Sequence, residues 1–229
     1  MRKLFFISSF VFLAMQTSYA ASKNVCENKI ERSKECVESI NFKNSDFYNK
    51  KGKFLPEKAK DAIIALLNYH GYPMFDGIRD RIFVMDYNSG NFLNVGLSGL
   101  MYENNQKNLY MLLDIFLLPN QMLAEHWHVD GETTAAKREG WLVRWGKSYV
   151  AGIGKDNLSN FPEIKIPKIH WNGKVKANHV KVAERGDFYN LEQVLSPHWQ
   201  MAGDEGAIIT EVANFADGKA VKRTDPKMN

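Results

Sequence analysis

The chain has 229 residues and a formal net charge of +4 at pH 7. A charge this small, with no cluster of Lys and Arg, argues against a nucleic-acid partner. The length suits one β-rich domain with additions rather than several large domains.

The first twenty residues have the three-part layout of a secretory signal peptide. A basic start, Met1-Arg2-Lys3, precedes a nearly continuous apolar run over residues 4–15, and the small-residue site Ser18-Tyr19-Ala20 follows. The apolar run is too short to span a membrane, and a buried helix would not be apolar on every face. We therefore expect cleavage after Ala20, export to the periplasm or beyond, no membrane anchor, and a net charge that falls from +4 to +2.

Two cysteines, Cys26 and Cys36, follow the expected cleavage site. In an oxidising compartment such a pair is most simply a disulfide that closes a small loop, and two thiols alone are poor evidence for a metal site. Residues 21–77 are expected to form an N-terminal extension that contains this bridge.

A helix is predicted near residues 56–69 of that extension. Pro56 occupies the position of a first-turn proline, and Gly71 and Pro73 end the pattern. The apolar residues at helical spacing are Ala62, Ile63, Leu66 and Leu67.

Short apolar runs separated by Gly, Asn and Asp replace the helical pattern from residue 81 onward. The strand candidates are residues 81–87, 92–97, 110–118, 123–129, 141–145, 148–153, 165–169, 180–182 and 207–212. Many short strands at even spacing indicate an all-β antiparallel barrel or sandwich, and no linker divides residues 78–229.

The segment Ala124-Glu125-His126-Trp127-His128-Val129 carries a His-x-His pair on a predicted strand. Side chains at positions i and i+2 of a strand point to the same face, so both imidazoles would enter one cavity. Glu125 should then face away from that cavity.

Two further residues complete a candidate ligand set for a metal ion. Glu139 stands at the start of the apolar run 141–143, where the next antiparallel strand would carry it beside the two histidines, and His198 lies near a later strand. Three imidazoles and one carboxylate suit Mn, Zn, Fe, Co or Ni. For His70, His170 and His179 we prefer a solvated or hydrogen-bonded role.

The flanks of these ligands resemble a known family. The stretches Phe116-Leu117-Leu118-Pro119-Asn120-Gln121, Glu125-His126-Trp127-His128 and Lys137-Arg138-Glu139-Gly140-Trp141 are similar to the first motif of the D-lyxose isomerase-like cupins, and Ser196-Pro197-His198-Trp199-Gln200-Met201-Ala202-Gly203-Asp204-Glu205-Gly206 resembles the second. The resemblance covers residues 78–226. The chain departs from the family at Ala124, where proline is usual, at Asn120, where glycine is common, and in its signal peptide.

The resemblance implies a fold and a metal site. The fold would be a cupin double-stranded β-helix, or jelly-roll barrel, with an N-terminal helical extension. His126, His128, Glu139 and His198 would bind a divalent metal, for which we expect Mn.

The same resemblance implies aldose–ketose isomerisation of a sugar through a metal-stabilised cis-enediol, with Lys137 and Glu211 as the acid/base pair. Two other interpretations stay open from the residues alone. Lys137 could be a solvated loop lysine, and Glu211 could form a structural ion pair with an arginine such as Arg144.

Two other function classes also fit the ligand set. One is a cupin oxygenase or oxidase, and the other is a non-catalytic periplasmic protein that binds a sugar or a metal. Most tryptophans near the motifs are expected to pack in the core, and cupins commonly form homodimers, which we expect here. The residues do not identify the sugar or the metal.

Overall fold

The structure, a computed structural model, describes residues 40–228. The expected signal peptide (1–20) and the expected Cys26–Cys36 disulfide lie outside the described residues, so both stay predictions. Among residues 40–228, no helix is long and apolar enough to cross a membrane.

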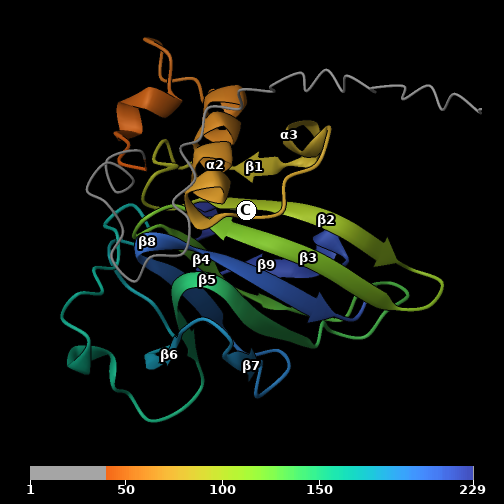
Figure 1. Cartoon of the computed structure of the whole chain (residues 1–229). Helices are drawn as coiled ribbons and strands as arrows, with labels where there is room; N and C mark the ends of the chain where they lie inside the picture. Colours follow the sequence, from red (N-terminus) through yellow and green to blue (C-terminus); the bar gives the residue numbers. More distant parts are fainter. Residues whose placement is uncertain (1–39, 229) are drawn as a thin grey trace, which may run out of the picture.

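Helix α2 (Pro56–His70) coincides with the helix predicted near residues 56–69. Pro56 begins it, and Gly71 ends it in the left-handed conformation (φ 67°), as expected for residues that pre-set the first turn and allow a positive φ. Its apolar face, with Ile63 and Leu66 fully buried, packs against Phe116 and Ile208 of the sheet. In Figure 1 the helix lies along the outside of the sheet.

The remaining elements are short helices and nine strands within the described residues. The helices are η1 (Asn44–Phe47), α3 (Ile78–Arg81), η2 (Leu158–Asn160), η3 (Gly218–Ala220) and η4 (Pro226–Met228). The strands are β1 (Phe83–Met85), β2 (Leu97–Asn105), β3 (Tyr110–Leu117), β4 (Met122–His128), β5 (Glu139–Gly152), β6 (His179–Ala183), β7 (Phe188–Asn190), β8 (His198–Ala213) and β9 (Val221–Arg223).

The strands form one curled antiparallel sheet in the order β1-β2-β3-β8-β4-β9, and β5 pairs with β8, β6 and β7. The molecule is therefore mostly β, with a half-barrel of antiparallel strands and few helices (Figure 1). The predicted fold class, a cupin-type β-barrel with an N-terminal helical extension, is confirmed.

The paired strands β5 and β8 bend near Gly146. The pairing register shifts around Gly146, and both Gly146 and Gly206 have positive φ (72° and 75°). A Cβ atom on Gly146 would collide with the main-chain oxygen of Gly206, so the two backbones approach each other as only glycine allows. Trp141 before the bend consequently contacts His198 beyond it, with ring centroids 5.6 Å apart.

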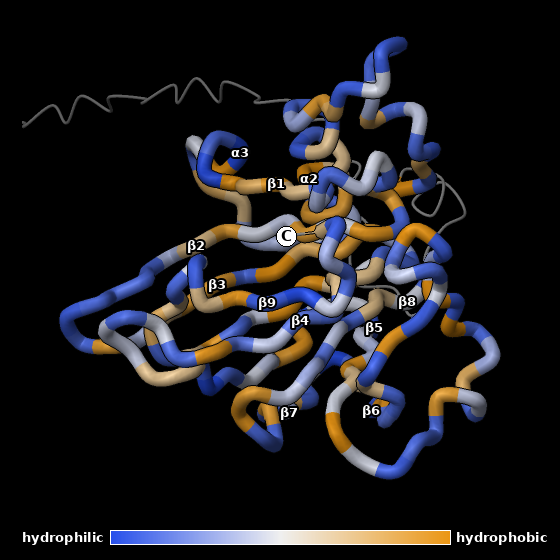
Figure 2. The backbone as a smooth tube through the Cα atoms, turned by 180° about the vertical axis from the view of Figure 1, so that it is seen from behind, coloured by the Kyte–Doolittle hydropathy of each residue, from blue (hydrophilic) through white to orange (hydrophobic). Residues whose placement is uncertain are grey.

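Successive side chains of a strand point to opposite faces, and β3 is apolar at consecutive positions, so apolar residues lie on both faces of the sheet. In β3, Leu113 and Ile115 enter the barrel interior with Val143 and Ile209, whereas Phe116 faces α2. Figure 2 shows that the hairpin between β2 and β3 is hydrophilic at its tip. The N-terminal extension and the barrel thus share one core on the outer face.

Several predicted strands were wrong or incomplete. Residues 92–97 were expected to be a strand, but residues 92–94 form a turn and Val95 makes only an isolated bridge, and Phe92 is apolar because it packs beneath α2. Residues 165–169 are irregular, since Pro167 has no N–H to donate to a ladder. The runs 141–145 and 148–153 belong to the single strand β5. The predicted strands missed β7, β9, all of β2 beyond Leu97 and the first half of β8.

Candidate metal centre

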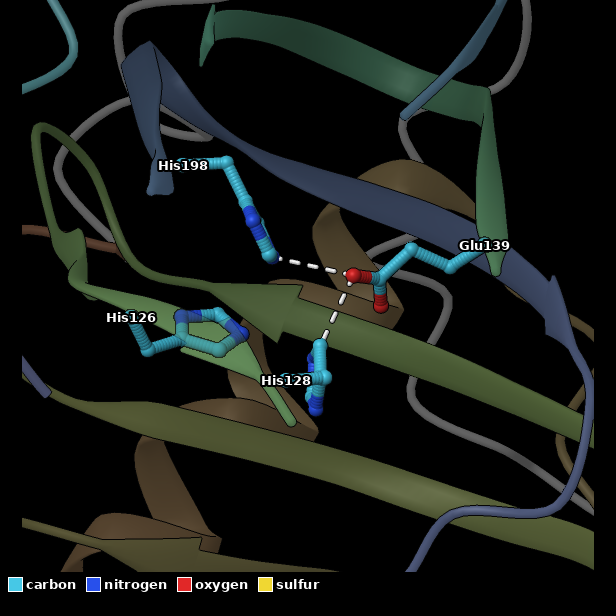
Figure 3. A group of neighbouring side chains, drawn as sticks. All are labelled: His126, His128, Glu139 and His198. Carbon is cyan, nitrogen blue, oxygen red and sulfur yellow. Dashed lines mark ion pairs between the residues drawn. The ribbon is translucent and has the colours of Figure 1, made fainter. Parts of the chain in front are cut away.

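Three strands place the four candidate ligands at one point inside the barrel. His126 and His128 alternate with Trp127 on β4, so both imidazoles point inward, as the His-x-His spacing predicted. His198, the first residue of β8, is the direct register partner of His126. Glu139, the first residue of β5, reaches the same point across the bend, and Figure 3 shows the four side chains converging.

The distances are short enough for one ion to contact all four residues. Oε1 of Glu139 lies 3.2 Å from Nε2 of His128 and 3.0 Å from Nε2 of His198. The rings of His126 and His198 are 4.3 Å apart between centroids. One ligand atom from each of the four residues can be chosen so that all lie within 4.8 Å of one another.

The hydrogen bonds of the histidines leave their Nε2 atoms for a metal. Nδ1 of His126 donates to the carbonyl of Ala124 (2.9 Å), and Nδ1 of His198 donates to that of Ser196 (3.0 Å), which fixes both tautomers. Nε2 of His128, Nε2 of His198 and Oε1 of Glu139 are buried without a hydrogen-bond partner. Buried polar atoms rarely stay unpaired, so this donor set fits a divalent cation and could hold one.

Lys137 and Glu211 lie beside the ligands. Nζ of Lys137 is 2.8 Å from Oε2 of Glu139 and forms a second ion pair with Glu211. The lysine and Glu211 are only 8% and 4% exposed. The alternatives left open by the sequence are therefore excluded, because Lys137 is not solvated and Glu211 pairs with it rather than with the exposed Arg144.

Burial and charge shift the pKa values of three of the four ligands in directions that favour metal binding. Burial holds the pKa of His126 well below its usual value, aided by His198 and His128, and burial also lowers the pKa of His128. Burial alone would raise the pKa of Glu139, but the Lys137 ammonium and His198 hold it well below its usual range. Neutral imidazoles and an ionised carboxylate are the forms that coordinate metals.

The other titratable groups of the centre respond to the same contacts. Burial disfavours the cationic form of His198, yet attraction to the nearby Glu139 carboxylate raises its pKa. For Lys137, burial acts to lower the pKa, but Glu211 and Glu139 together raise it. Burial raises the pKa of Glu211 to about 7, against the attraction of Lys137.

The remaining histidines and Glu125 have structural partners. Nδ1 of His170 donates to Lys174 O (3.0 Å), and its Nε2 accepts from the main-chain N–H of Glu125 (3.2 Å). His70 contacts Glu205 O (2.9 Å), and His179 contacts Lys155 O (2.8 Å). None of the three joins the centre.

Glu125 faces away from the centre, as the strand alternation predicted, but it is fully buried rather than solvated. Its carboxylate accepts hydrogen bonds from the main-chain N–H groups of Lys176 and Ala177 at 2.7–2.9 Å. It thereby fastens an irregular surface segment to the strand that carries the histidine pair.

Two features near the centre were not anticipated from the sequence. Asn214 hydrogen-bonds to the main chain of Arg138, between Lys137 and Glu139, and no motif marks it. A cleft borders His198, one of the four candidate ligands. Its lining includes Trp141, His198, Asn190, Lys181, Glu192 and Ser196.

Comparison with known proteins finds sequence relatives among sugar isomerases. The chain is 28% identical over 176 residues to a D-lyxose ketol-isomerase of Thermofilum sp., covering 77% of this chain and 94% of that protein. It is 29% identical over 150 residues to a D-lyxose/D-mannose isomerase of Thermosediminibacter oceani, covering 66% and 80%. The chain is a distant homologue of D-lyxose isomerases. The family resemblance read from the two motifs is thus confirmed, although no family model matches the chain.

Similarity to solved structures is weaker. An oxalate decarboxylase of Bacillus subtilis matches with a TM-score of 0.40 and 14% identity, covering 57% of this chain and 28% of that one. An oxalate oxidase matches with a TM-score of 0.33 and 13% identity, covering 50% and 46%. The sequence relatives, which this chain covers over 80–94% of their length, are the more informative comparison.

Proposed function

We propose that the protein is a metal-dependent aldose–ketose isomerase that uses Mn and acts on a sugar such as D-lyxose or D-mannose. The observation that carries the proposal is the buried Lys137–Glu211 pair beside three histidines and a glutamate. Two groups that can exchange protons, next to a site for a cation, are the requirement of this reaction.

His126, His128, Glu139 and His198 would hold the metal. When bound, the metal would polarise the sugar carbonyl and stabilise the negative charge that develops on the substrate oxygens. Because Oε2 of Glu139 is bound by Lys137, the carboxylate offers its Oε1 atom to the ion.

The protein side chains would move two protons. The carboxylate of Glu211 would remove the proton from C2 of the aldose and return it to C1, which converts the aldose to its isomeric ketose through a cis-enediol. The ammonium of Lys137 would donate a proton to O1 and recover one from the O2 hydroxyl. Substrate and product are isomers, so the reaction needs no oxidant, reductant or second substrate.

The cleft beside the centre supports a polyhydroxylated substrate. Trp141 presents an aromatic surface, and Asn190, Ser196, Lys181 and Glu192 add polar groups. A mixture of aromatic and polar lining is typical of sites that bind small polar molecules in a fixed orientation.

The decisive experiment is a screen of Mn-loaded protein against aldoses and ketoses, beginning with D-lyxose and D-mannose. Conversion to the matching ketoses is expected, with solvent deuterium at C1 in those turnovers in which the Glu211 carboxyl exchanges its proton before returning it. Full metal occupancy without conversion of any sugar would overturn the isomerase proposal. Oxygen consumption would indicate an oxygenase, whereas sugar or metal binding without turnover would indicate a binding protein.

Two variants separate metal binding from proton transfer. His128→Ala should lose most of the metal, and Glu211→Gln should keep the metal but lose activity. Glu57→Gln removes a carboxylate from an exposed ion pair on α2, far from the ligands in the sequence. It is the control that should change neither metal content nor activity. Loss of metal from the Glu211 variant would contradict its assigned role.

We also propose export of the chain and formation of a homodimer. Residues 1–20 support export, and N-terminal sequencing of protein recovered from the periplasm should then begin at Ala21.

The exposed Leu112 and Val212, register partners on β3 and β8, support a dimer through the outer face of the sheet. Light scattering that gives only a monomer mass would reject the dimer.

A further inference from the structure

The metal ligand Glu139 lies at the very start of β5, where a strand is least secure. Its register partner is Ala213, the last residue of β8. One residue further out, the ladder would have to continue through Arg138 and Asn214, which lie beyond both strands. Backbone groups at such an end open most readily, and here the opening would displace a ligand.

The side chain of Asn214 completes the ladder at this position. Directly opposite residues of an antiparallel pair can exchange two N–H···O bonds. The main-chain N–H of Asn214 donates to Arg138 O (3.2 Å), as the ladder requires. The second bond runs from the N–H of Arg138 to the side-chain Oδ1 of Asn214 (2.5 Å) instead of to its main-chain oxygen.

Because the side-chain oxygen of Asn214 takes the place of its main-chain oxygen, the chain can leave the sheet after Ala213 while the start of β5 stays hydrogen-bonded. Arg138 stands between Lys137 and Glu139, so fixing its two backbone groups fixes the direction of both neighbouring side chains. Those side chains point the same way, toward the centre, because they are two residues apart.

Asn214 is itself anchored from a third strand. The side-chain amide of Asn104, near the end of β2, donates to Ala216 O (3.0 Å) and accepts from Ala216 N (2.9 Å). The two asparagines therefore link the end of β2 to the start of β5 through residues 214–216.

We propose that Asn214 is a positioning residue that sets the coordinating geometry of Glu139 and the placement of Lys137. The inference rests on the metal centre of the proposed function, but it does not depend on which reaction the centre performs. Asn214 acts through the backbone of Arg138 and contacts neither metal nor substrate.

The test compares Asn214→Ala, Asn214→Asp and a matched control, Asn157→Ala. Asn157 bonds to both backbone groups of Val180 (3.0 and 2.7 Å) and so makes the same kind of clamp away from the ligands. Asn214→Ala should weaken Mn binding about 10-fold, the low end for residues that support metal ligands. Asn214→Asp keeps an acceptor for the Arg138 N–H and should restore most of the affinity, and Asn157→Ala should leave the affinity unchanged.

Two further measurements do not depend on catalysis. In the metal-free protein, amide hydrogen exchange at Arg138 should accelerate in Asn214→Ala and recover in Asn214→Asp. The Mn EPR spectrum of Asn214→Ala should differ from that of the wild type, because the ligand field of Glu139 changes. If Asn214→Ala does not fold, Asn104→Ala loosens the same segment from a distance and should shift exchange and affinity in the same direction.

The outcomes distinguish this inference from the proposed function. Wild-type protein that binds Mn but isomerises no sugar would reject the function alone. Unchanged Mn affinity and unchanged Arg138 exchange in Asn214→Ala would overturn the positioning role. Equal loss of affinity in Asn157→Ala would also overturn it, since general destabilisation would then explain the effect, and a wild type that binds no metal would reject both.

Discussion

Nζ of Lys137 lies 2.8 Å from Oε2 of Glu139, so the carboxylate among the candidate metal ligands is also paired with a buried ammonium group. Lys137 also pairs with Glu211, and all three side chains are almost inaccessible to solvent. The lysine thus neutralises part of the negative charge that the barrel interior would otherwise hold.

Removing this ammonium should destabilise the metal-free protein. Lys137→Met would leave two buried carboxylates without their cation, and we expect a loss of about 3 kcal/mol in the free energy of unfolding, measured by urea denaturation. Lys181→Met is the matched control, because its ion pair with Glu192 is partly exposed and should contribute less than about 1 kcal/mol. Equal losses in both variants would contradict the role given to Lys137.

Metal removal should lower the stability of the wild type. A ligand that binds only the folded state at 100 times its dissociation constant adds about 2.7 kcal/mol, and a chelator should abolish this gain. His198→Ala should show no gain with Mn, whereas His179→Ala should retain it because His179 contacts Lys155 away from the centre. If neither Mn nor a chelator changes the free energy of unfolding of the wild type, the metal site is refuted.

His170 should matter for folding but not for metal. Both of its ring nitrogens are hydrogen-bonded and the residue is fully buried, so His170→Ala removes two bonds and leaves the Glu125 N–H unpaired. We expect a loss of about 2–3 kcal/mol, with the metal content per chain unchanged. A fall in metal content of the folded variant would show that the distinction between structural and ligand histidines is mistaken.

The ligand set could be predicted from the sequence because its geometry is local. His126 and His128 are two positions apart on β4, and Lys137 and Glu139 are two positions apart in the extended chain that enters β5, so alternation alone places each pair on one face. The position of His198 relative to Glu139 depends on the bend at Gly146, which no local pattern specifies. The family motifs supplied that long-range information.

The errors in the strand prediction have a similar cause. Phe92 is apolar because it lies beneath α2, and its environment comes from an element more than twenty residues earlier in the chain. Asn214 has an ordinary local sequence, and its function arises only from its register opposite Arg138. Tertiary contacts, which single-sequence patterns do not contain, decided both positions.

The bend itself can be tested with one methyl group. Gly146→Ala would force a Cβ against the main chain of Gly206 at a positive φ, and we expect a loss of about 1–3 kcal/mol with weaker Mn binding. Gly218→Ala, where a Cβ would meet nothing within 4 Å, is the control and should change neither quantity. Thermal unfolding and calorimetric titration with Mn measure the two effects, and a fully stable Gly146→Ala would mean that the strands do not approach this closely.

Strand β8 begins at His198 and carries Glu211 near its end, yet both residues approach Glu139. Extended strand rises about 3.4 Å per residue, so a straight strand would hold these two residues roughly 40 Å apart. An ion bound at the centre would therefore join the start of β8, through His198, to its end, through Glu139 on the paired strand β5. Such an ion would act as a crosslink that closes a loop of chain. Loss of the ion should first loosen the contact between the two ends of β8, before α2 or the outer face of the sheet unfolds.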